Sequence, residues 1–370
     1  MKIGILTYHR AENYGALLQA YALKTYLTQQ GYEVSFVDYW PQYHVEHYRI
    51  FSSSYFKTRN LKGKVFYLLW FLFWAKTRYS RKKKLTRFMR ERLNVPQVVK
   101  YQFNDDVCNE YDAVIYGSDQ IWRKQEFESF TGYNPWYFGS DNILSRQKIS
   151  YAASMGKTTD IDHDERKQLS LLLKNFNKIS VREYDLQQLV ITLGFSAEQV
   201  IDPVFLLSND YWSGLFPKKR KKENPYIFYY NLLSSPESDR YVAFLQAKTG
   251  LPVKEISLLF DRKHISGRFI HSASVEEFLY LIANADYVVS NSFHGIAFSI
   301  IFRKEFFVLG LNDKSSRITS LLERCGLGDR LIKSDNMKVE LNNIDYEAVQ
   351  SNLSKYIELS KTFLTEIDEN

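Results

Sequence analysis

The sequence alternates short apolar stretches with helix-like segments, and this alternation limits the folds open to it. Residues 2–7 form an apolar strand pattern, residues 15–30 have apolar side chains near helical spacing, and residues 33–38 are strand-like again. A strand, a helix and a further strand in this order predict parallel strands joined by a right-handed crossover. The chain is therefore predicted to be an α/β protein.

The alternation continues, breaks once and restarts. Before the break, strands are predicted at 113–116, 148–152, 178–181 and 199–201, and helices at 163–174 and 183–193. The stretch PKKRKKENP, residues 217–225, is charged and has no apolar period, so it is predicted to be an exposed linker. Beyond it, strands are predicted at 226–230, 253–257, 287–289 and 305–309, with helices at 237–248, 275–284, from 296 onward, and 316–325.

The chain's 370 residues exceed one typical hydrophobic core. We predict two doubly wound, Rossmann-like α/β domains that face each other across a cleft. The first covers 1–216 and includes a basic helical insertion at about 51–100, and the second covers 226–345. The remaining residues, 346–370, contain a last helix that could pack back across the first domain.

The composition is that of a globular protein, with 25% charged and 45% apolar residues. Cys108 and Cys325 lie in separate halves and form no C-x-x-C pair, so neither metal nor redox chemistry is indicated. The start, MKIGILTYH, has the pattern of a strand, not of a signal peptide. We therefore expect a cytoplasmic protein.

The net charge is +7, and the excess of positive charge is concentrated in the insertion. Between Lys57 and Lys100 there is one acidic residue, Glu91, among many basic ones, around an apolar middle at 65–75. This middle is about half the ~20 residues that a transmembrane helix needs. The favoured interpretation is a helix docked on its own domain. Peripheral contact with an anionic membrane surface is the alternative, and nucleic-acid binding is disfavoured because the aromatic and basic residues do not interleave.

Five polar loops follow predicted strands: HRAENYG, GSDQIWR, AASMG, VRE and SNSFHG. Ligands of doubly wound sheets bind at the carboxyl ends of the strands, so all five loops could face the same cleft. This coincidence is more informative than any single motif.

The loops of the first domain suit an anion or a sugar. Asn13, Tyr14 and Gly15 precede a helix whose free N–H groups attract an anion, although Asn13 could simply cap that helix. The second loop offers hydrogen bonds to sugar hydroxyls and an aromatic stacking face, with Asp119 as a helix cap the plainer interpretation. The candidate residues here are Ser118, Asp119, Gln120 and Trp122, with Ser154 from the third loop.

Arg182 and His294 are the candidates for charge-handling chemistry. Arg182 ends a strand, where its guanidinium could bind a carboxylate or phosphate or form a salt bridge with Glu183 or Asp185. His294 follows another strand and could hold a phosphate or donate a proton to one as it leaves, against the plainer role of a core or capping histidine. Gly295 would allow close approach of the backbone to a ligand, in a pocket rich in donors from Ser290, Asn291 and Ser292.

The sequence gives little support for a metal site or for the common nucleotide-binding and hydrolase motifs. Asp162, His163 and Asp164 loosely match an acidic metal motif, but they precede a helix whose dipole favours acids, so no metal site is predicted. Glycine-rich dinucleotide loops, Walker loops and nucleophile elbows do not occur in the sequence. We expect no cofactor.

In nearly its whole length the chain resembles the polysaccharide pyruvyl transferase family. The resemblance lies in KIGILTYHRAENYGALLQAYAL, YDAVIYGSDQIW, ISYAASMG, SVRE, VIDPVFLL, SVEEFLYLIANADYVVSNSFHGIAFSIIF and SRITSLLERCGL, in this order. It implies a GT-B-like fold and an enzyme that transfers the pyruvyl group of phosphoenolpyruvate to a sugar as a ketal. The acceptor would be a sugar or lipid-linked oligosaccharide of a capsular or exopolysaccharide precursor.

The resemblance also implies roles for the candidate residues. His294 and Arg182 would be catalytic, and the loops of the first domain would hold the acceptor. The donor would lie against the second domain, at Asn291, Ser292, Phe293, Gly295 and Arg317.

One position departs from the family. In several members the second-domain motif resembles Arg-Leu-His, with an arginine two residues before the histidine. In this chain that position is Ser292, two residues before His294. Arg317, in SSRITS, could replace the missing arginine. Two alternatives stay open: a nucleotide-sugar glycosyltransferase of the same fold, and a non-catalytic glycan-binding relative.

Overall fold

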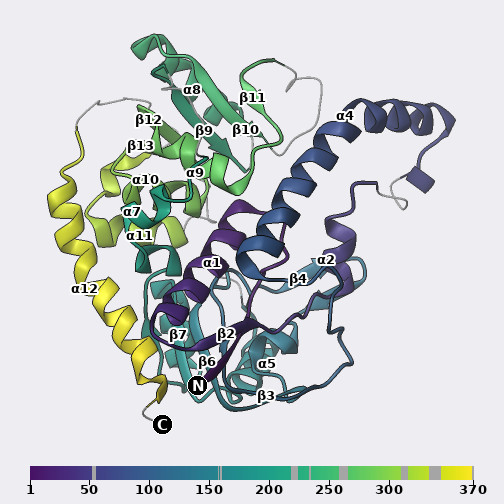
Figure 1. Cartoon of the computed structure of the whole chain (residues 1–370), viewed down its shortest axis with the longest axis vertical. Coiled ribbons are helices and arrows are strands. Elements are labelled where there is room, and N and C mark those ends of the chain that lie inside the picture. Colours follow the sequence, from purple (N-terminus) through teal and green to yellow (C-terminus); the bar gives the residue numbers. More distant parts are fainter. Residues whose placement is uncertain are drawn as a thin grey trace.

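Two parallel six-stranded sheets form the frame of the molecule (Figure 1). The computed structural model describes residues 1–51, 56–156, 158, 161–217, 224–232, 235–257, 266–309, 316–332 and 343–368. Every strand pair within these two sheets is parallel, which confirms the predicted α/β class with two doubly wound units. Most of the predicted linker at 217–225 lies outside the described residues.

The first sheet has the strand order β2-β1-β3-β6-β7-β8. Its strands are β1 (Lys2–Leu6), β2 (Glu33–Phe36), β3 (Val107–Tyr116), β6 (Ile143–Ala153), β7 (Lys178–Val181) and β8 (Glu198–Gln199). A separate antiparallel hairpin consists of β4 (Gln125–Phe127) and β5 (Phe130–Gly132).

The second sheet has the order β11-β10-β9-β12-β13-β14. Its strands are β9 (Ile227–Asn231), β10 (Val253–Ser257), β11 (Phe269–Ile270), β12 (Tyr287–Ser290), β13 (Glu305–Leu309) and β14 (Leu331–Ile332). Numbered within the unit, this is the order 3-2-1-4-5-6 of a dinucleotide-binding fold.

Helices cover the faces of both sheets. In the first unit they are α1 (Tyr14–Gln29), α2 (Gln42–His47), α4 (Leu61–Phe88), α5 (His163–Leu173), α6 (Tyr184–Thr192) and α7 (Asn209–Ser213). In the second they are α8 (Pro236–Thr249), α9 (Val275–Ala283), α10 (Phe293–Ile301) and α11 (Ser316–Cys325), and α12 (Tyr346–Thr365) follows them.

Side-chain caps explain where several helices begin. Asp162 and Ser274 each form a capping box, with Glu165 at the start of α5 and with Glu277 at the start of α9. Asp162 therefore has the structural role that the sequence indicated.

One continuous apolar cluster joins the two units. The ring of Tyr14 from α1 stacks on that of Phe278 from α9, with centroids 4.8 Å apart. Trp212 of α7 meets Phe298 of α10 edge to face at 5.0 Å. The faces of the two units are thus packed together by aromatic side chains.

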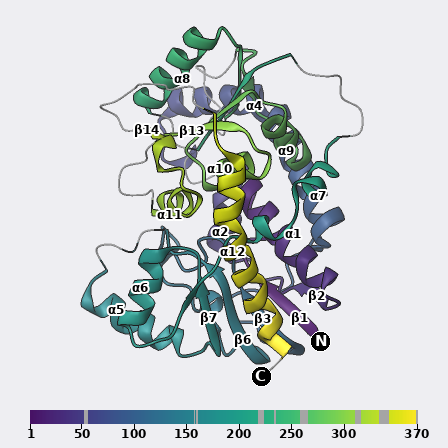
Figure 2. The same cartoon turned by 90° about the vertical axis from the view of Figure 1, so that its left-hand side faces the viewer.

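Helix α12 runs along both units (Figure 2). Near its start, Arg303 donates to Glu347, and near its end the amide of Ile201 donates to Ser360 Oγ at 2.8 Å. The buried ring of Phe363 lies against Tyr151 of β6. The last helix therefore contacts both the second unit and the first sheet.

Candidate active site

The topological switch points of the two sheets meet. In the first sheet the strand order reverses between β1 and β3, and in the second between β9 and β12. Loops leaving strands at a switch point form the ligand crevice of this fold class. The loop after β1 leads into α1, the loop after β12 leads into α10, and these two helices contact each other. The five polar loops selected from the sequence include both.

Gly15 and His294 meet between the two switch points. A Cβ atom placed on Gly15 would lie 2.1 Å from Nδ1 of the imidazole, well inside van der Waals contact. Only glycine leaves room for the ring here. The first turn of α1 therefore fixes one side of His294, across the boundary between the units.

Asp202 lies at the centre of the polar cluster. Arg182 Nη1 donates to its Oδ2 at 2.6 Å, and the hydroxyl of Ser118 donates to the same oxygen at 3.2 Å. His294 Nε2 is 3.6 Å from that oxygen. One carboxylate thus links three predicted site residues that come from three different loops.

Arg182 is held rigidly. Its Nε donates to Glu183 Oε1 at 3.2 Å, and its guanidinium carbon lies 4.3 Å from the ring centroid of Phe293. Glu183 is one of the two salt-bridge partners of Arg182 that the sequence suggested, and Asp202 is a further partner that it did not suggest. Among the described residues, Arg182 Nη2 and His294 Nε2 are buried without a hydrogen-bond partner. These two N–H positions are the ones that an anionic substrate would satisfy.

Burial and neighbouring charges shift the pKa values of the two acids and of Arg182 in different directions. Burial by itself raises the pKa of Asp202, but His294 and the Arg182 guanidinium outweigh it and hold this pKa below its ordinary value. For Glu183 burial prevails over the nearby arginines and raises the pKa. Burial lowers the pKa of Arg182, yet Glu183 and Asp202 reverse the effect and raise it. Asp202 is therefore the firmly ionised acid of the site.

Arg317 brings a second cation to the same edge from α11. When the side-chain amide of Gln120 is oriented with its oxygen toward Arg317, that oxygen accepts hydrogen bonds from Arg317 Nη2 at 2.9 Å and from Nη1 at 3.3 Å. Burial, with the neighbouring Arg182 charge, lowers the pKa of Arg317 to about 10, so it stays charged at neutral pH. The pair connects a loop of the first unit to a helix of the second.

The remaining polar residues of the first unit lie close by. Asp119 has a positive φ of 74°, and its Oδ1 accepts from the amide of Gln120. The Ser154 hydroxyl is buried beside Glu183. Asn13 caps α1 by accepting from the amides of Gly15 and Ala16, which is the plainer role that the sequence left open.

Two aromatic candidates of the first unit are corrected. Trp122 is fully buried, donates from Nε1 to the carbonyl of Tyr137 and stacks on Phe138, so its ring offers no face to a sugar. Tyr14 is also buried, and its hydroxyl donates to the carbonyl of Ala273 in the second unit. Both rings pack in the core, Tyr14 from the first turn of α1 and Trp122 from the loop after β3.

The second-unit motif also differs from expectation. Helix α10 begins at Phe293, not at Ile296, so His294 and Gly295 belong to its first turn. A Cβ on Gly295 would lie 2.4 Å from Ser290 Oγ, so this glycine serves the packing of helix on strand and not the approach of a ligand. The Asn291 amide donates to Asn231 and accepts from the amide of Leu232. Ser290 Oγ donates to the carbonyl of Tyr230 and accepts from the amide of Ser292.

Sequence reasoning named Glu183 only as a possible partner of Arg182 and missed Asp202. Asp202 follows the strand predicted at 199–201, so the rule that selected the other loops applies to it as well. Asp202 was passed over because VIDPV has no glycine or histidine to mark it. Its importance comes from three long-range contacts that local pattern does not encode.

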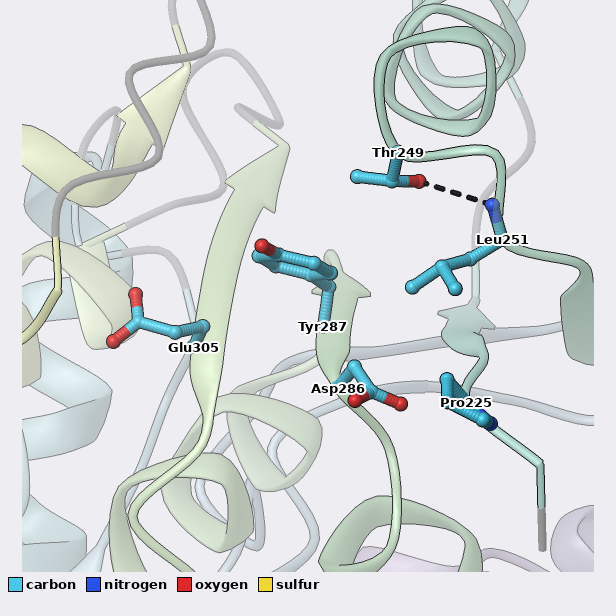
Figure 3. Close-up of a pocket in the computed structure, with 6 residues that line it drawn as sticks. All are labelled: Pro225, Thr249, Leu251, Asp286, Tyr287 and Glu305. Carbon is cyan, nitrogen blue, oxygen red and sulfur yellow. Dashed lines mark hydrogen bonds between the residues drawn. The ribbon is translucent and has the colours of Figure 1, made fainter.

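One surface hollow lies away from this cluster. It has a volume of about 390 Å³ and is lined by residues at the amino ends of strands, among them Pro225, Asp286, Tyr287 and Glu305 (Figure 3). In doubly wound sheets that edge is opposite to the ligand edge. Within the described ranges, no group of three or more His, Cys, Asp or Glu side chains could hold a metal ion.

Comparison with known proteins assigns the chain to a family. The polysaccharide pyruvyl transferase family model matches residues 13–313. The class that the fold and the polar cluster define is that of two-unit α/β proteins with polar residues between the switch points of their sheets. Within that class, the chain belongs to the polysaccharide pyruvyl transferase family, an enzyme family.

Solved structures similar to this one have a low sequence identity to it. UDP-GlcNAc 2-epimerase from Neisseria meningitidis, bound to UDP-GlcNAc, is 9% identical with a TM-score of 0.47, over 99% of this chain and 94% of that one. The Methanocaldococcus jannaschii UDP-GlcNAc 2-epimerase with UDP-GlcNAc and UDP is 10% identical at 0.48, over 97% and 92%. E. coli heptosyltransferase WaaC with ADP is 12% identical at 0.42, over 96% and 100%. The search of curated proteins found no match.

Proposed function

We propose that the protein transfers the pyruvyl group of phosphoenolpyruvate to two hydroxyls of one sugar in a capsular or exopolysaccharide precursor. The observation that carries this proposal is the cluster of Arg182, Asp202 and His294 at the meeting point of the two units. It combines cations for a donor with two anionic groups with a histidine that can move a proton. Family membership supports the same reaction class.

The reaction sets clear demands. Both sugar hydroxyl oxygens form bonds to C2 of phosphoenolpyruvate, the bond from C2 to the phosphate oxygen breaks, and phosphate leaves. Of the two hydroxyl protons, one ends on the methylene carbon, which becomes a methyl group, and one ends on phosphate. The site must therefore bind a carboxylate and a phosphate and must supply an acid.

Residues of the cluster can bind the two anionic groups of the donor and supply the acid. Arg182 Nη2 and the Arg317 guanidinium present N–H donors to the two anionic groups of the donor. Arg317 replaces the arginine that several family members have at the position of Ser292. His294 Nε2 gives its proton to the departing phosphate, and Asp202, whose Oδ2 lies 3.6 Å from the same nitrogen, stabilises the charged ring.

The acceptor is assigned to the loops of the first unit. Ser118, Asp119, Gln120 and Ser154 lie around the same cluster and offer hydroxyl, carboxylate and amide groups to a sugar. We propose a lipid-linked oligosaccharide as the natural acceptor and the cytoplasmic face of the membrane as the place of reaction. In the part of the chain that the structure describes, no helix could cross a membrane.

Ligand-dependent melting separates this proposal from the alternative of a nucleotide-sugar glycosyltransferase. A ligand that binds only the folded state raises the melting temperature. We expect phosphoenolpyruvate to stabilise the protein, and Arg182→Ala together with Arg317→Ala to abolish that shift. Stabilisation by UDP- or ADP-sugars and none by phosphoenolpyruvate would reverse the assignment. A sugar-induced shift without turnover of any donor would indicate a glycan-binding relative.

A further inference from the structure

Helix α4 is divided into two parts that differ in their surroundings. Its last turns are docked on the body, where Leu85 and Phe88 are buried. Lys82 pairs with Glu12 of the first unit at 2.6 Å, and Lys84 with Glu277 of the second at 2.9 Å. The amino-terminal turns stand clear of both sheets (Figure 1). The helix is thus anchored at one end and projects at the other.

The projecting part has an exposed apolar stripe. Leu61, Val65, Leu68, Leu69 and Leu72 recur at the spacing i, i+4, i+7, i+8, i+11, which places them on one face of a helix. With Phe73 beside them, they form what we call the α4 stripe, and these six side chains are 41–79% exposed. Contiguous exposed apolar surface of this kind marks an interaction site.

The other face of α4 is turned toward the protein's own aromatic residues. Trp74 is buried, and the rings of Tyr67 and Phe71 lie 5.3 Å from that of Phe51. The sequence-based preference for a helix docked on its own domain is therefore right for one face and for the last turns only. It is wrong for the stripe, because apolar residues surround this helix more widely than the body can cover.

The charge around the stripe is of one sign. From Lys57 to Arg90 there are twelve Lys or Arg residues and no Asp or Glu. Lys62 is exposed within the length of the stripe, and Lys76 and Lys83 are exposed beyond it. Two copies of the helix would bring these like charges together, which disfavours self-association through the stripe. An anionic surface complements both features.

We propose that the α4 stripe inserts into the surface of an anionic lipid bilayer. The helix would lie in the interface, with its leucines among the acyl chains and its lysines at the headgroups. No span of the bilayer is involved. This inference does not depend on the pyruvyl transfer reaction, although it would hold the active site near a lipid-linked acceptor.

Vesicle binding tests the proposal with matched variants. The full chain is sedimented with vesicles of pure phosphatidylcholine and with vesicles containing phosphatidylglycerol. The stripe variant carries Leu68→Glu and Leu72→Glu. Its control carries Leu171→Glu and Ile191→Glu, which make the same change at exposed apolar positions of α5 and α6. A charge variant, Lys62→Gln with Lys76→Gln, is compared with Lys167→Gln and Lys174→Gln on and just after α5.

We expect the wild type to bind only the anionic vesicles, and more weakly as salt is raised. The stripe variant should lose at least about tenfold in affinity, and the charge variant about fivefold for each lysine removed. Both controls should bind like the wild type.

Two results would overturn the proposal. One is equal binding by the stripe variant and its control, or no binding by the wild type. The other is a dimer in sedimentation velocity that the stripe variant abolishes, which would make the stripe a contact between copies. Phosphate release with a soluble acceptor should be the same for wild type and stripe variant, so the reaction is tested separately.

Discussion

Single atoms decide the geometry around His294, and Gly15 shows this most clearly. Replacing glycine by alanine in a helix ordinarily stabilises it by up to about 1 kcal/mol. At Gly15 the new methyl group would lie 2.1 Å from the imidazole, so the clash should dominate. We predict that Gly15→Ala lowers the free energy of unfolding by about 1–3 kcal/mol and displaces His294, with loss of turnover.

A control separates this effect from a general intolerance of alanine. At Gly328 an added Cβ meets nothing within 4 Å, so Gly328→Ala should leave both stability and turnover unchanged. Urea unfolding and phosphate release measure the two quantities. Wild-type turnover in Gly15→Ala would mean that the position of His294 has no importance for the reaction.

Because His44 is buried, we predict that the free energy of unfolding falls in mild acid. Burial, with the nearby charge of His47, lowers its pKa to about 3, whereas an unfolded histidine has a pKa of about 6.5. A lowered folded-state pKa gives stability above the unfolded value, and this stability is lost as pH falls from about 6.5 toward 3. The loss should be about 2 kcal/mol between pH 7 and about pH 5.

His44→Phe should remove that part of the pH dependence. The imidazole ring stacks on Trp40 at 4.5 Å, and neither of its nitrogens has a hydrogen-bond partner among the described residues, so phenylalanine suits the position. The measurement is urea unfolding at both pH values. The same decline in the variant as in the wild type would rule out His44 as its source.

At the scale of elements, the buried ring of Phe363 anchors the end of helix α12 on the first unit. Phe363 is 1% exposed and lies between Tyr151 and the Lys178 ammonium, whose Nζ is 4.1 Å from the ring centroid. Phe363→Ala should therefore lower the free energy of unfolding by about 3–5 kcal/mol. Leu359→Ala, on an exposed position of the same helix, should change it by less than about 0.5 kcal/mol. Equal effects of the two substitutions would show that Phe363 does not anchor α12 on the first unit.

Most strands and helices could be predicted from local pattern. The strands β7, β10 and β13 and the helix α11 have the predicted limits, because apolar periodicity and turn residues bound them clearly. The start of α10 was predicted three residues too late, since Gly295 is a poor helix former and indicated a loop up to that position. The stripe of α4 was also hidden, because periodicity shows which residues share a face but not whether anything covers that face.

The site itself could be predicted only in part. Choosing polar loops at strand ends found Arg182, Ser118 and His294, which the structure brings to one carboxylate. The same rule selected Trp122, whose ring turns inward, and passed over Asp202. A sequence pattern fixes which end of a strand a residue occupies, but the direction of its side chain depends on packing across the two units.

At the scale of the whole molecule, the two sheets place their switch points against each other, and this arrangement is the basis of the proposed reaction. The most direct measurement combines phosphate release from phosphoenolpyruvate with the mass of the sugar product, over a panel of terminal galactosides, glucosides and mannosides. We predict phosphate release only when a suitable acceptor is present, with one carboxyethylidene group added to the product. His294→Ala and Arg182→Ala should lower turnover roughly 100- to 10,000-fold, while His163→Ala does not. Normal turnover in the first two variants, or phosphate release without a modified sugar, would contradict the account.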